Sequence, residues 1–212
     1  MASRVIAVVN QKGGTGKTTL SMNLAAGLSR RGRTLVVDAD PQGSATQWAR
    51  LSSESKPYPA SVVAVAGPLG REVARFRDDY RYVVVDCPPT LESGAAQAAM
   101  GAADLVLIPV LPSPMDLWGS VRMAKALDQA RTENDRLAAY LVVNQVEMRN
   151  ALSRAMEQAL AEFDIPALES KLQRRAVYRN TALEGSSVYE YGKRGEAAAA
   201  EIDALIEEAV RA

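Results

Sequence analysis

Six short, continuously apolar runs alternate with longer segments of helical pattern, and this alternation limits the possible fold more than any other feature. The apolar runs cover residues 5–10, 34–38, 61–65, 82–86, 104–110 and 140–144. The helical segments lie near residues 17–31, 69–78, 92–101, 117–133 and 151–163. Runs that are apolar at every position are typical of strands buried on both faces of a parallel sheet. The pattern therefore predicts a doubly wound α/β fold with a mostly parallel sheet.

The length favours one domain spanning residues 1–212, because a chain of this size can bury one substantial core. The 25 basic and 25 acidic residues balance, so any nucleic-acid or membrane partner must be recognised by a local patch. No apolar stretch approaches the roughly 18 residues of a membrane span, and the N-terminus does not have the pattern of a signal peptide. We therefore expect a cytoplasmic protein.

Two residue types exclude whole classes of chemistry. Histidine is absent, which rules out Ser-His-Asp and Cys-His catalysis and most zinc sites. Cys87 is the only cysteine, so one chain holds neither an internal disulfide nor a multi-cysteine metal site. The strongest base that remains for hydrolysis is a carboxylate.

The first apolar run leads into a glycine-rich loop, and together they read "VIAVVNQKGGTGKTTL" over residues 5–20. The loop ends as the phosphate-binding pattern G-x-x-x-x-G-K-[ST] does, with GKT at residues 16–18. The opening glycine of the pattern is replaced by Gln11, and an additional cation, Lys12, follows it. The sequence therefore predicts a phosphate-binding loop that carries one lysine more than usual.

Glycines in this loop let the backbone curl so that its N–H groups point at phosphate oxygens, and the following helix directs its N-terminal dipole at the same anion. Lys17 would reach the β- and γ-phosphates, and the Thr18 hydroxyl would ligate Mg²⁺. A glycine-rich turn without a ligand is the alternative, but a strand before the loop and a helix after it favour phosphate binding. The expected nucleotide-binding residues of the loop are Gly13, Gly14, Thr15, Gly16, Lys17, Thr18 and Thr19.

Acidic residues follow two other predicted strands, at the carboxyl ends where ligands bind in such sheets. Residues two apart on a strand point to the same side, so Asp38 and Asp40 can both face a nucleotide. Asp38 suits Mg²⁺ coordination through water, and Asp40 suits orienting an attacking water. The alternative is an Asp-Pro turn in which Asp40 caps a helix after Pro41. Asp86, which ends the run 82–86, is the expected Walker B residue for Mg²⁺.

Three motifs occur in a specific order and spacing, "KGGTGKTT" at 12–19, "DADPQ" at 38–42 and "VVVDCPP" at 83–89. Together they resemble the deviant-Walker-A ATPases of the ParA/MinD group. Residues 108–119 and 172–191 narrow the resemblance to the small, ParF-like ParA proteins that lack an N-terminal DNA-binding domain. The resemblance covers nearly the whole chain. It implies a P-loop NTPase that uses ATP and Mg²⁺, forms a homodimer with ATP and hydrolyses ATP weakly until a partner protein stimulates it.

The resemblance also gives Lys12 a role, and the expected catalytic residues are Lys12, Lys17 and Asp40. In the family this extra lysine reaches across the dimer interface to the partner's ATP. Since Lys17 already serves the phosphates of its own loop, a second nucleotide facing it would need another cation. The alternative is a solvated surface lysine.

Polar and proline residues after two later strands extend the expected site. Asn144 ends a strand and is a candidate for an adenine or interface contact, or for an ordinary turn. The prolines match the family's segment beside the nucleotide and the dimer interface, and a purely structural rigid loop is nearly as well supported. The expected interface residues are Lys12, Pro109, Pro112 and Pro114.

A basic stretch near the C-terminus is the candidate DNA-binding surface. Residues 171–195 carry six cations and two anions, and phosphate contacts require clustered Lys and Arg. No base-reading motif is present, so DNA binding should be largely independent of sequence. The alternative is an ordinary solvated face. The candidate residues are Lys171, Arg174, Arg175, Arg179, Lys193 and Arg194, and the three middle arginines are expected within one or two helical turns.

The last helix, expected over about 196–210, separates this chain from two related branches. Its polar side is acidic and would be repelled by anionic lipid, unlike the basic membrane helix of MinD-type relatives. The single Cys87 cannot hold the bridging cluster of nitrogenase-iron-protein relatives. We therefore expect no membrane partner.

These observations favour a nucleoid-associated partition ATPase that binds nonspecific DNA as an ATP-bound dimer and moves or spaces a cargo. The expected cargo is a plasmid, and a ParB-like or other adaptor protein would stimulate hydrolysis. One alternative keeps the ATPase and changes the cargo to a protein organelle or cluster. A less favoured alternative is a metabolic ligase of the dethiobiotin-synthetase type, against which Lys12 and the basic stretch argue.

Overall fold

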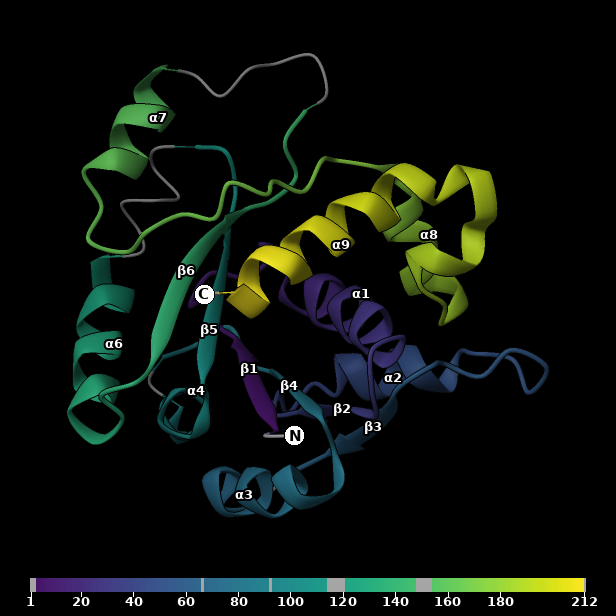
Figure 1. The fold of residues 1–212 in the computed structure, drawn as a ribbon, viewed down its shortest axis with the longest axis horizontal. Helices are drawn as coiled ribbons and strands as arrows, with labels where there is room; N and C mark the ends of the chain where they lie inside the picture. Colours follow the sequence, from purple (N-terminus) through teal and green to yellow (C-terminus); the bar gives the residue numbers. More distant parts are fainter. Residues whose placement is uncertain (1–2, 66, 92, 114–120, 148–153, 212) are drawn as a thin grey trace.

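Six parallel strands form the centre of the computed structural model, which describes residues 3–65, 67–91, 93–113, 121–147 and 154–211 (Figure 1). The strands are β1 (Arg4–Val8), β2 (Thr34–Asp38), β3 (Ser61–Ala64), β4 (Tyr82–Asp86), β5 (Leu105–Val110) and β6 (Ala138–Val143). Their order in the sheet is β3-β2-β4-β1-β5-β6, and every neighbouring pair is parallel. The predicted single-domain α/β fold is confirmed.

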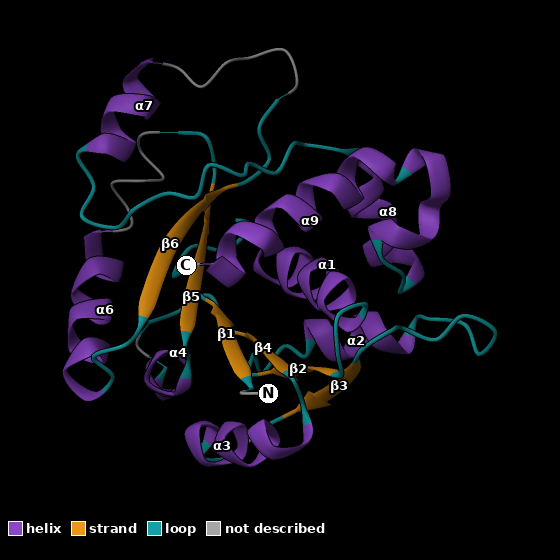
Figure 2. Ribbon diagram, in the orientation of Figure 1, coloured by secondary structure: helices purple, strands orange, loops and turns teal. Residues whose placement is uncertain are grey.

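Helices cover both faces of the sheet (Figure 2). They are α1 (Lys17–Ser29), α2 (Ser44–Arg50), α3 (Leu69–Asp79), α4 (Gly94–Ala102), α6 (Val121–Glu133), α7 (Arg154–Ala161), α8 (Ala176–Glu184), the 3₁₀ segment η1 (Val188–Arg194) and α9 (Glu196–Arg211). Alternate residues of β1 pack into the two hydrophobic cores on opposite faces of the sheet. Val5 and Ala7 pack with α3, α4 and α6, whereas Ile6 and Val8 pack with α1 and α9. Because strand side chains alternate between faces, an apolar residue is required at every position of such a strand.

The structure corrects one strand prediction and adds helices. Residues 61–65 were expected to be buried on both faces, but β3 lies at the edge of the sheet and Ser61 and Ala64 are exposed. Helix α2 forms between β2 and β3, where no helix is predicted apart from the alternative after Pro41. The predicted last helix is present as α9 and buries Ala198, Ile202, Leu205, Ile206 and Ala209 as expected. No helix among the described residues has both the length and the apolar character needed to cross a membrane.

An extended segment between α7 and α8 runs beside β6 and brings the chain back to the carboxyl ends of the strands (Figure 1). The N–H of Leu172 donates to the carbonyl of Val143 at 3.0 Å. The carboxylate of Glu208 on α9 accepts the N–H groups of Glu169 at 2.7 Å and Ser170 at 2.9 Å. The acidic side of α9 therefore holds this segment in place.

Candidate nucleotide-binding site

The glycine-rich loop connects β1 to α1, as predicted from the sequence. Gly14 and Gly16 have φ values of 77° and 89°, in the left-handed region that favours glycine. A Cβ atom at Gly13 or Gly14 would meet nothing within 4 Å, so this side of the loop borders open space. The N-terminus of α1 follows directly, and its first N–H groups are available to an anion. The loop thus has the shape and the polarity that a phosphate group requires.

Lys17 is buried at the base of the loop. Its Nζ atom donates to the carbonyl of Lys12 at 3.1 Å, and the Thr15 hydroxyl donates to the same carbonyl at 3.4 Å. Burial lowers the pKa of Lys17, and the charges of Asp86 and Asp40 oppose this shift. The ammonium group is therefore held inside the loop and not in solvent. In this position it can reach a phosphate bound by the loop.

Asp86 at the end of β4 is fully buried and binds two hydroxyl groups of α1. Thr18 donates to its Oδ2 atom at 2.7 Å, and Ser21 donates to its Oδ1 atom at 2.9 Å. Burial raises the pKa of Asp86 to about 7, the two hydroxyl donors oppose the shift, and Asp38 adds to it. Ser21 is not among the residues predicted from the sequence, although its i, i+3 spacing from Thr18 places both hydroxyls on one helix face.

Asp38 and Asp40, both predicted to face a nucleotide, differ in burial and in hydrogen bonding. Strand β2 ends at Asp38, so the two-residue period does not extend to Asp40. Asp38 is buried, and its Oδ2 atom accepts the N–H of Thr46 in the first turn of α2 at 2.8 Å. Asp40 is half-buried and accepts the N–H of Gln42 at 3.0 Å. The carboxylate that bonds the start of α2 is therefore Asp38, whereas the alternative had assigned that bond to Asp40.

The oxygen atoms at the strand ends fit Mg²⁺. The donors are the Thr18 hydroxyl and the Asp86 carboxylate, with Asp38 beside Asp86 on the neighbouring strand. Within the described part of the chain, no group of three or more His, Cys, Asp or Glu residues could hold a metal ion by itself. Mg²⁺ is usually bound through one or two carboxylates, several waters and the phosphates of a substrate. The residues present therefore suit an ion that arrives with a nucleotide.

Two amide side chains after β6 contact the loop from outside. Asn144 is buried, and its Nδ2 atom donates to the carbonyl of Thr15 at 2.8 Å. The Nε2 atom of Gln145 donates to the carbonyl of Gly14 at 3.2 Å. A Cβ atom at Gly16 would lie 2.4 Å from Asn144 Nδ2, so a glycine is required there. Asn144, predicted to contact adenine or an interface, thus contacts the loop backbone in this structure.

A cavity of about 680 Å³ adjoins the loop between the start of α1, the end of β6 and α8. Its walls are mainly apolar, with Leu20, Leu172 and Ala182 among the lining residues. Arginines line the same cavity, and planar guanidinium groups stack well on aromatic rings. The size and lining suit a nucleotide base. The lining arginines are three of the DNA-binding candidates, Arg174, Arg175 and Arg179.

The arginines of the basic stretch do not share one helix. Helix α8 begins at Ala176, so Arg174 and Arg175 precede it and only Arg179 lies within it, contrary to the expectation of shared helical turns. Arg175 forms a 2.7 Å ion pair with Glu201 of α9, in which both side chains are mostly buried. Arg174 pairs with Glu147 at 3.7 Å on the exposed surface.

The remaining basic candidates are exposed. Lys171 lies in the extended segment beside β6, Arg179 lies on α8, and both side chains face solvent. Lys193 and Arg194 end η1 and are exposed as well. Unlike Arg175, these four side chains have no acidic partner at ion-pair distance among the described residues.

The predicted interface residues are distributed over several environments. Lys12 is exposed on the rim of the loop, and its N–H donates to Asn10 Oδ1 at 3.0 Å. Pro109 is buried within β5, where its carbonyl accepts from Asn10 Nδ2 at 2.8 Å. Pro112 is half-buried after that strand, and Pro114 lies outside the described residues.

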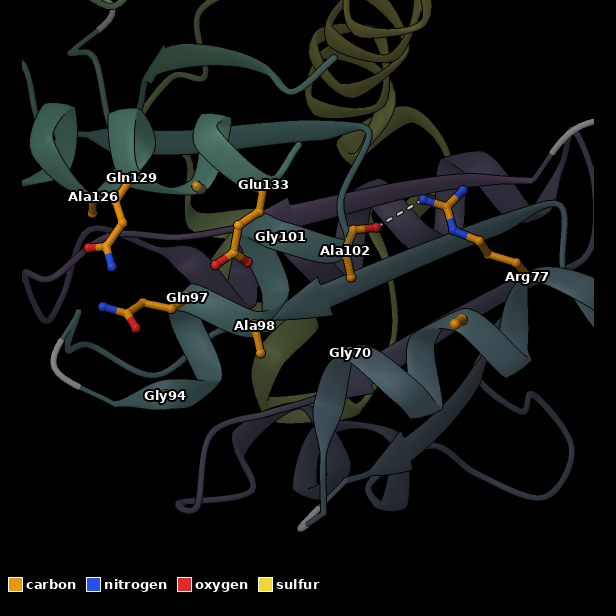
Figure 3. A pocket seen from close by; sticks show the side chains of 12 residues that line it. Gly70, Arg77, Gly94, Gln97, Ala98, Gly101, Ala102, Ala126, Gln129 and Glu133 are labelled. Atoms are coloured by element: carbon orange, nitrogen blue, oxygen red, sulfur yellow. Dashed lines mark hydrogen bonds between the residues drawn. The ribbon is translucent and has the colours of Figure 1, made fainter. Parts of the chain in front are cut away.

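A separate cavity of about 560 Å³ lies between α3, α4 and α6 (Figure 3). The side chains of Gln97, Gln129 and Glu133 point into it, and small residues of α4 form much of its wall (Figure 3). Arg77 at one end donates to the carbonyl of Ala102 at 2.9 Å. None of the residues predicted to bind nucleotide lines this cavity.

A glycine-rich loop between a parallel strand and a helix, a lysine buried in that loop, and a threonine bonded to a strand-end aspartate define a P-loop nucleotide-binding protein. A family model described as the CobQ/CobB/MinD/ParA nucleotide binding domain matches residues 6–188. The chain belongs to the MinD/ParA family of ATPases.

Individual relatives agree with this assignment. The maintenance of carboxysome distribution protein A of Halothiobacillus neapolitanus is 43% identical over 208 residues, which cover 97% of this chain and 95% of that protein. The chromosome-partitioning ATPase Soj of Thermus thermophilus is 34% identical over 188 residues, covering 74% of this chain and 75% of that protein. A solved structure of a Cyanothece McdA variant with ATP has a TM-score of 0.75 at 16% identity, covers 99% of this chain and 97% of that one, and shares its fold.

Family membership confirms the predicted enzyme class and ligands. The protein is an ATPase, and its cofactors are ATP and Mg²⁺. The loop, Lys17, Thr18 and Asp86 are the residues of this chain that fit those ligands.

Proposed function

We propose that residues 1–212 act as one ATPase domain that positions a protein organelle of the carboxysome type inside the cell. The observation that carries this proposal is the 43% identity over 97% of the chain to a protein named for maintaining carboxysome distribution. The sequence alone favours a plasmid as cargo, with a protein organelle as the alternative. The relative named for chromosome partitioning is less similar and matches 74% of the chain, which favours the organelle.

The proposed nucleotide site combines the loop, the strand ends and the adjoining cavity. Phosphates lie in the loop formed by Gly13, Gly14, Thr15, Gly16, Lys17, Thr18 and Thr19. Thr18, Asp38 and Asp86 hold Mg²⁺, in part through water, and Asp40 orients the water that attacks. The base enters the cavity beside Asn144, whose apolar walls and arginines provide contacts for a planar ring.

We assign the ATP-dependent dimer to the surface around Lys12. The exposed Lys12 side chain lies beside the open side of the loop, and Lys17 is already buried within it. A second subunit facing this rim would bring another triphosphate, whose charge requires a further cation. Pro112 and Pro114 are the proposed neighbouring contacts, whereas Pro109 contributes through the buried end of β5.

DNA phosphates are the proposed ligands of the exposed cations after β6. Lys171, Arg174, Arg179, Lys193 and Arg194 reach solvent and can contact a nucleic-acid backbone. Arg175 is held by Glu201, so its role in the proposal is to shape the neighbouring cavity. Contacts to phosphates alone give binding without sequence preference, which suits attachment to the nucleoid at any position.

A cycle of attachment and release follows from these assignments. Binding of ATP favours the dimer, which attaches to DNA, and an adaptor protein on the cargo stimulates hydrolysis. Hydrolysis removes the γ-phosphate that Lys12 contacts across the interface, so the dimer loses affinity for DNA. Cargo thereby moves toward regions where bound ATPase remains.

The cargo is identified by imaging in the source organism. A shell protein of its organelle is labelled, the gene for this ATPase is deleted, and organelle positions are compared with wild type and with a Lys12→Ala strain. Clustered organelles in both mutants, with unchanged retention of resident plasmids, is the expected result. Normal organelle spacing together with plasmid loss would transfer the assignment to plasmid partition.

A further inference from the structure

Gln145 has a backbone conformation that non-glycine residues rarely adopt. Its φ is 58°, and among the described residues it is the only non-glycine residue with positive φ. The left-handed region costs such residues free energy, and residues held there are concentrated at functional sites. Glycine would adopt this φ without strain. A non-glycine residue is kept at such a position where its side chain makes contacts that compensate for the strain.

That side chain contacts the phosphate loop. Gln145 Nε2 donates to the carbonyl of Gly14 at 3.2 Å, and Asn144 Nδ2 donates to the carbonyl of Thr15 at 2.8 Å. The two residues also bond each other, because the N–H of Gln145 donates to Asn144 Oδ1 at 2.8 Å. Two successive carbonyls of the loop are thus held on its outer side.

Fixing these carbonyls also fixes the N–H groups of the same peptide units. In a planar trans peptide the C=O and N–H bonds point in opposite directions. The peptide unit with the Gly14 carbonyl carries the N–H of Thr15, and the unit with the Thr15 carbonyl carries the N–H of Gly16. When Gln145 and Asn144 hold the two carbonyls outward, both N–H groups face the interior of the loop.

We propose that Gln145, together with Asn144, is a positioning residue that aims the N–H groups of Thr15 and Gly16 at the phosphates of a nucleoside di- or triphosphate. The inference rests on the phosphate placement proposed above. Both residues also line the cavity proposed for the base, so one turn after β6 contacts both halves of the nucleotide site. The next residue, Val146, anchors that turn through a 3.0 Å bond from its N–H to the carbonyl of Leu172.

Two variants separate the amide group of Gln145 from its backbone strain. Gln145→Met keeps the length of the side chain and the strained φ but removes the donor. Gln145→Gly removes the donor and relieves the strain. Loss of one hydrogen bond should weaken the binding of Mg-ADP, measured by titration calorimetry, by about threefold to tenfold in both variants. Thermal stability should differ, because only the glycine variant is expected to melt at a higher temperature than wild type.

Amide resonances provide a readout that a purely structural turn would not change. In ¹⁵N spectra, addition of Mg-ADP to wild-type protein should shift the Thr15 and Gly16 amides strongly, and both variants should show smaller shifts at saturation. Wild-type affinity in Gln145→Met, or in Gln145→Gly, would overturn the inference, since the amide group would then be dispensable. Failure of the wild-type protein to bind Mg-ADP would overturn the phosphate placement itself and this inference with it.

Discussion

Asp38 and Asp86 are register partners at the carboxyl ends of the neighbouring strands β2 and β4, and both carboxyl groups are buried. The charge of Asp38 adds to the effect of burial in raising the pKa of Asp86. Each carboxylate accepts hydrogen bonds from different donors. Asp86 accepts from the Thr18 and Ser21 hydroxyls, and Asp38 accepts from the backbone N–H of Thr46. The pair is thus an electrostatically costly site in the protein alone, and a divalent cation at the strand ends would relieve that cost.

The first prediction concerns the pH dependence of stability without nucleotide and with a chelator present. Burial raises the pKa of Asp86 from 3.8 to about 7, so folding favours its protonated form. Its contribution to stability is complete below pH 4 and is lost as the pH rises through 7. Asp86→Asn should therefore raise the free energy of unfolding more at pH 8 than at pH 5, by about 2–3 kcal/mol, since roughly two pKa units lie between pH 5 and 7. A difference between variant and wild type that stays constant over this range would contradict it.

The second prediction tests the role of Lys12. Lys12→Ala should bind ATP with nearly normal affinity, because the buried Lys17 and the loop N–H groups remain. The ATP-dependent dimer should disappear, as measured by sedimentation with a non-hydrolysable ATP analogue. Lys17→Ala is the matched control, and loss of its charged hydrogen bonds should weaken nucleotide binding about tenfold to a hundredfold. Normal dimerisation of Lys12→Ala would make Lys12 an ordinary surface lysine.

The third prediction separates the two acids of the "DADPQ" motif. Asp40→Ala removes the residue proposed to orient water, so stimulated turnover should fall by at least about a hundredfold while a Mg-ATP dimer accumulates. Asp38→Ala should behave differently, because it leaves the Thr46 N–H of α2 without its acceptor and costs about 1–3 kcal/mol of stability. Comparison of melting temperatures and steady-state rates checks both. Normal turnover by Asp40→Ala would leave Asp40 only its turn contact to Gln42.

Much of the fold was predictable because apolar runs report burial directly. Five of the six predicted strands are buried on both faces over most of their length, and their ends place the loop, Asp38 and Asp86 at one edge. The exposure of β3 was not predictable, since it depends on which strand lies at the edge of the sheet. The apolar runs predict where each strand lies in the sequence, but they do not predict which strands are neighbours in the sheet.

The missing site residues depend on contacts between distant parts of the chain. Ser21 could have been found from its spacing to Thr18 on α1. No sequence pattern identifies the strained φ of Gln145, because glutamine is not a residue type that prefers it. The ion-pair partner of Arg175 is Glu201, 26 residues later on α9. Because no local sequence pattern links the two residues, the sequence predicts that the Arg175 charge is available to DNA.

The fourth prediction concerns the buried contacts of Glu201. Its carboxylate accepts from Arg175 Nε at 2.8 Å and from the Tyr178 hydroxyl at 3.0 Å, beside the proposed base cavity. Glu201→Ala should destabilise the protein by about 2–3 kcal/mol and weaken ATP binding, because Arg175 loses its charged acceptor. Glu207→Ala on the same helix removes only exposed ion pairs and should change stability by less than about 0.5 kcal/mol. Chemical denaturation of both variants checks the contrast, and equal effects would contradict it.

The fifth prediction concerns DNA. One subunit offers only a few exposed cations in this region, so firm binding at physiological salt requires two copies, and log affinity should fall by about 0.9 per phosphate contact for each decade of salt. Lys193→Ala with Arg194→Ala removes two exposed cations at the end of η1 and should leave the ATP dimer intact. Affinity for random duplex DNA should drop, and the salt slope should flatten by close to two for each subunit in contact.

Arg122→Ala is the control. It removes an exposed cation from α6, on the other face of the sheet from α9, and should change neither the affinity nor the salt slope. Fluorescence anisotropy with ATP or ADP over a range of salt concentrations measures all of these effects, and equal affinity in the two nucleotide states would place the DNA surface elsewhere.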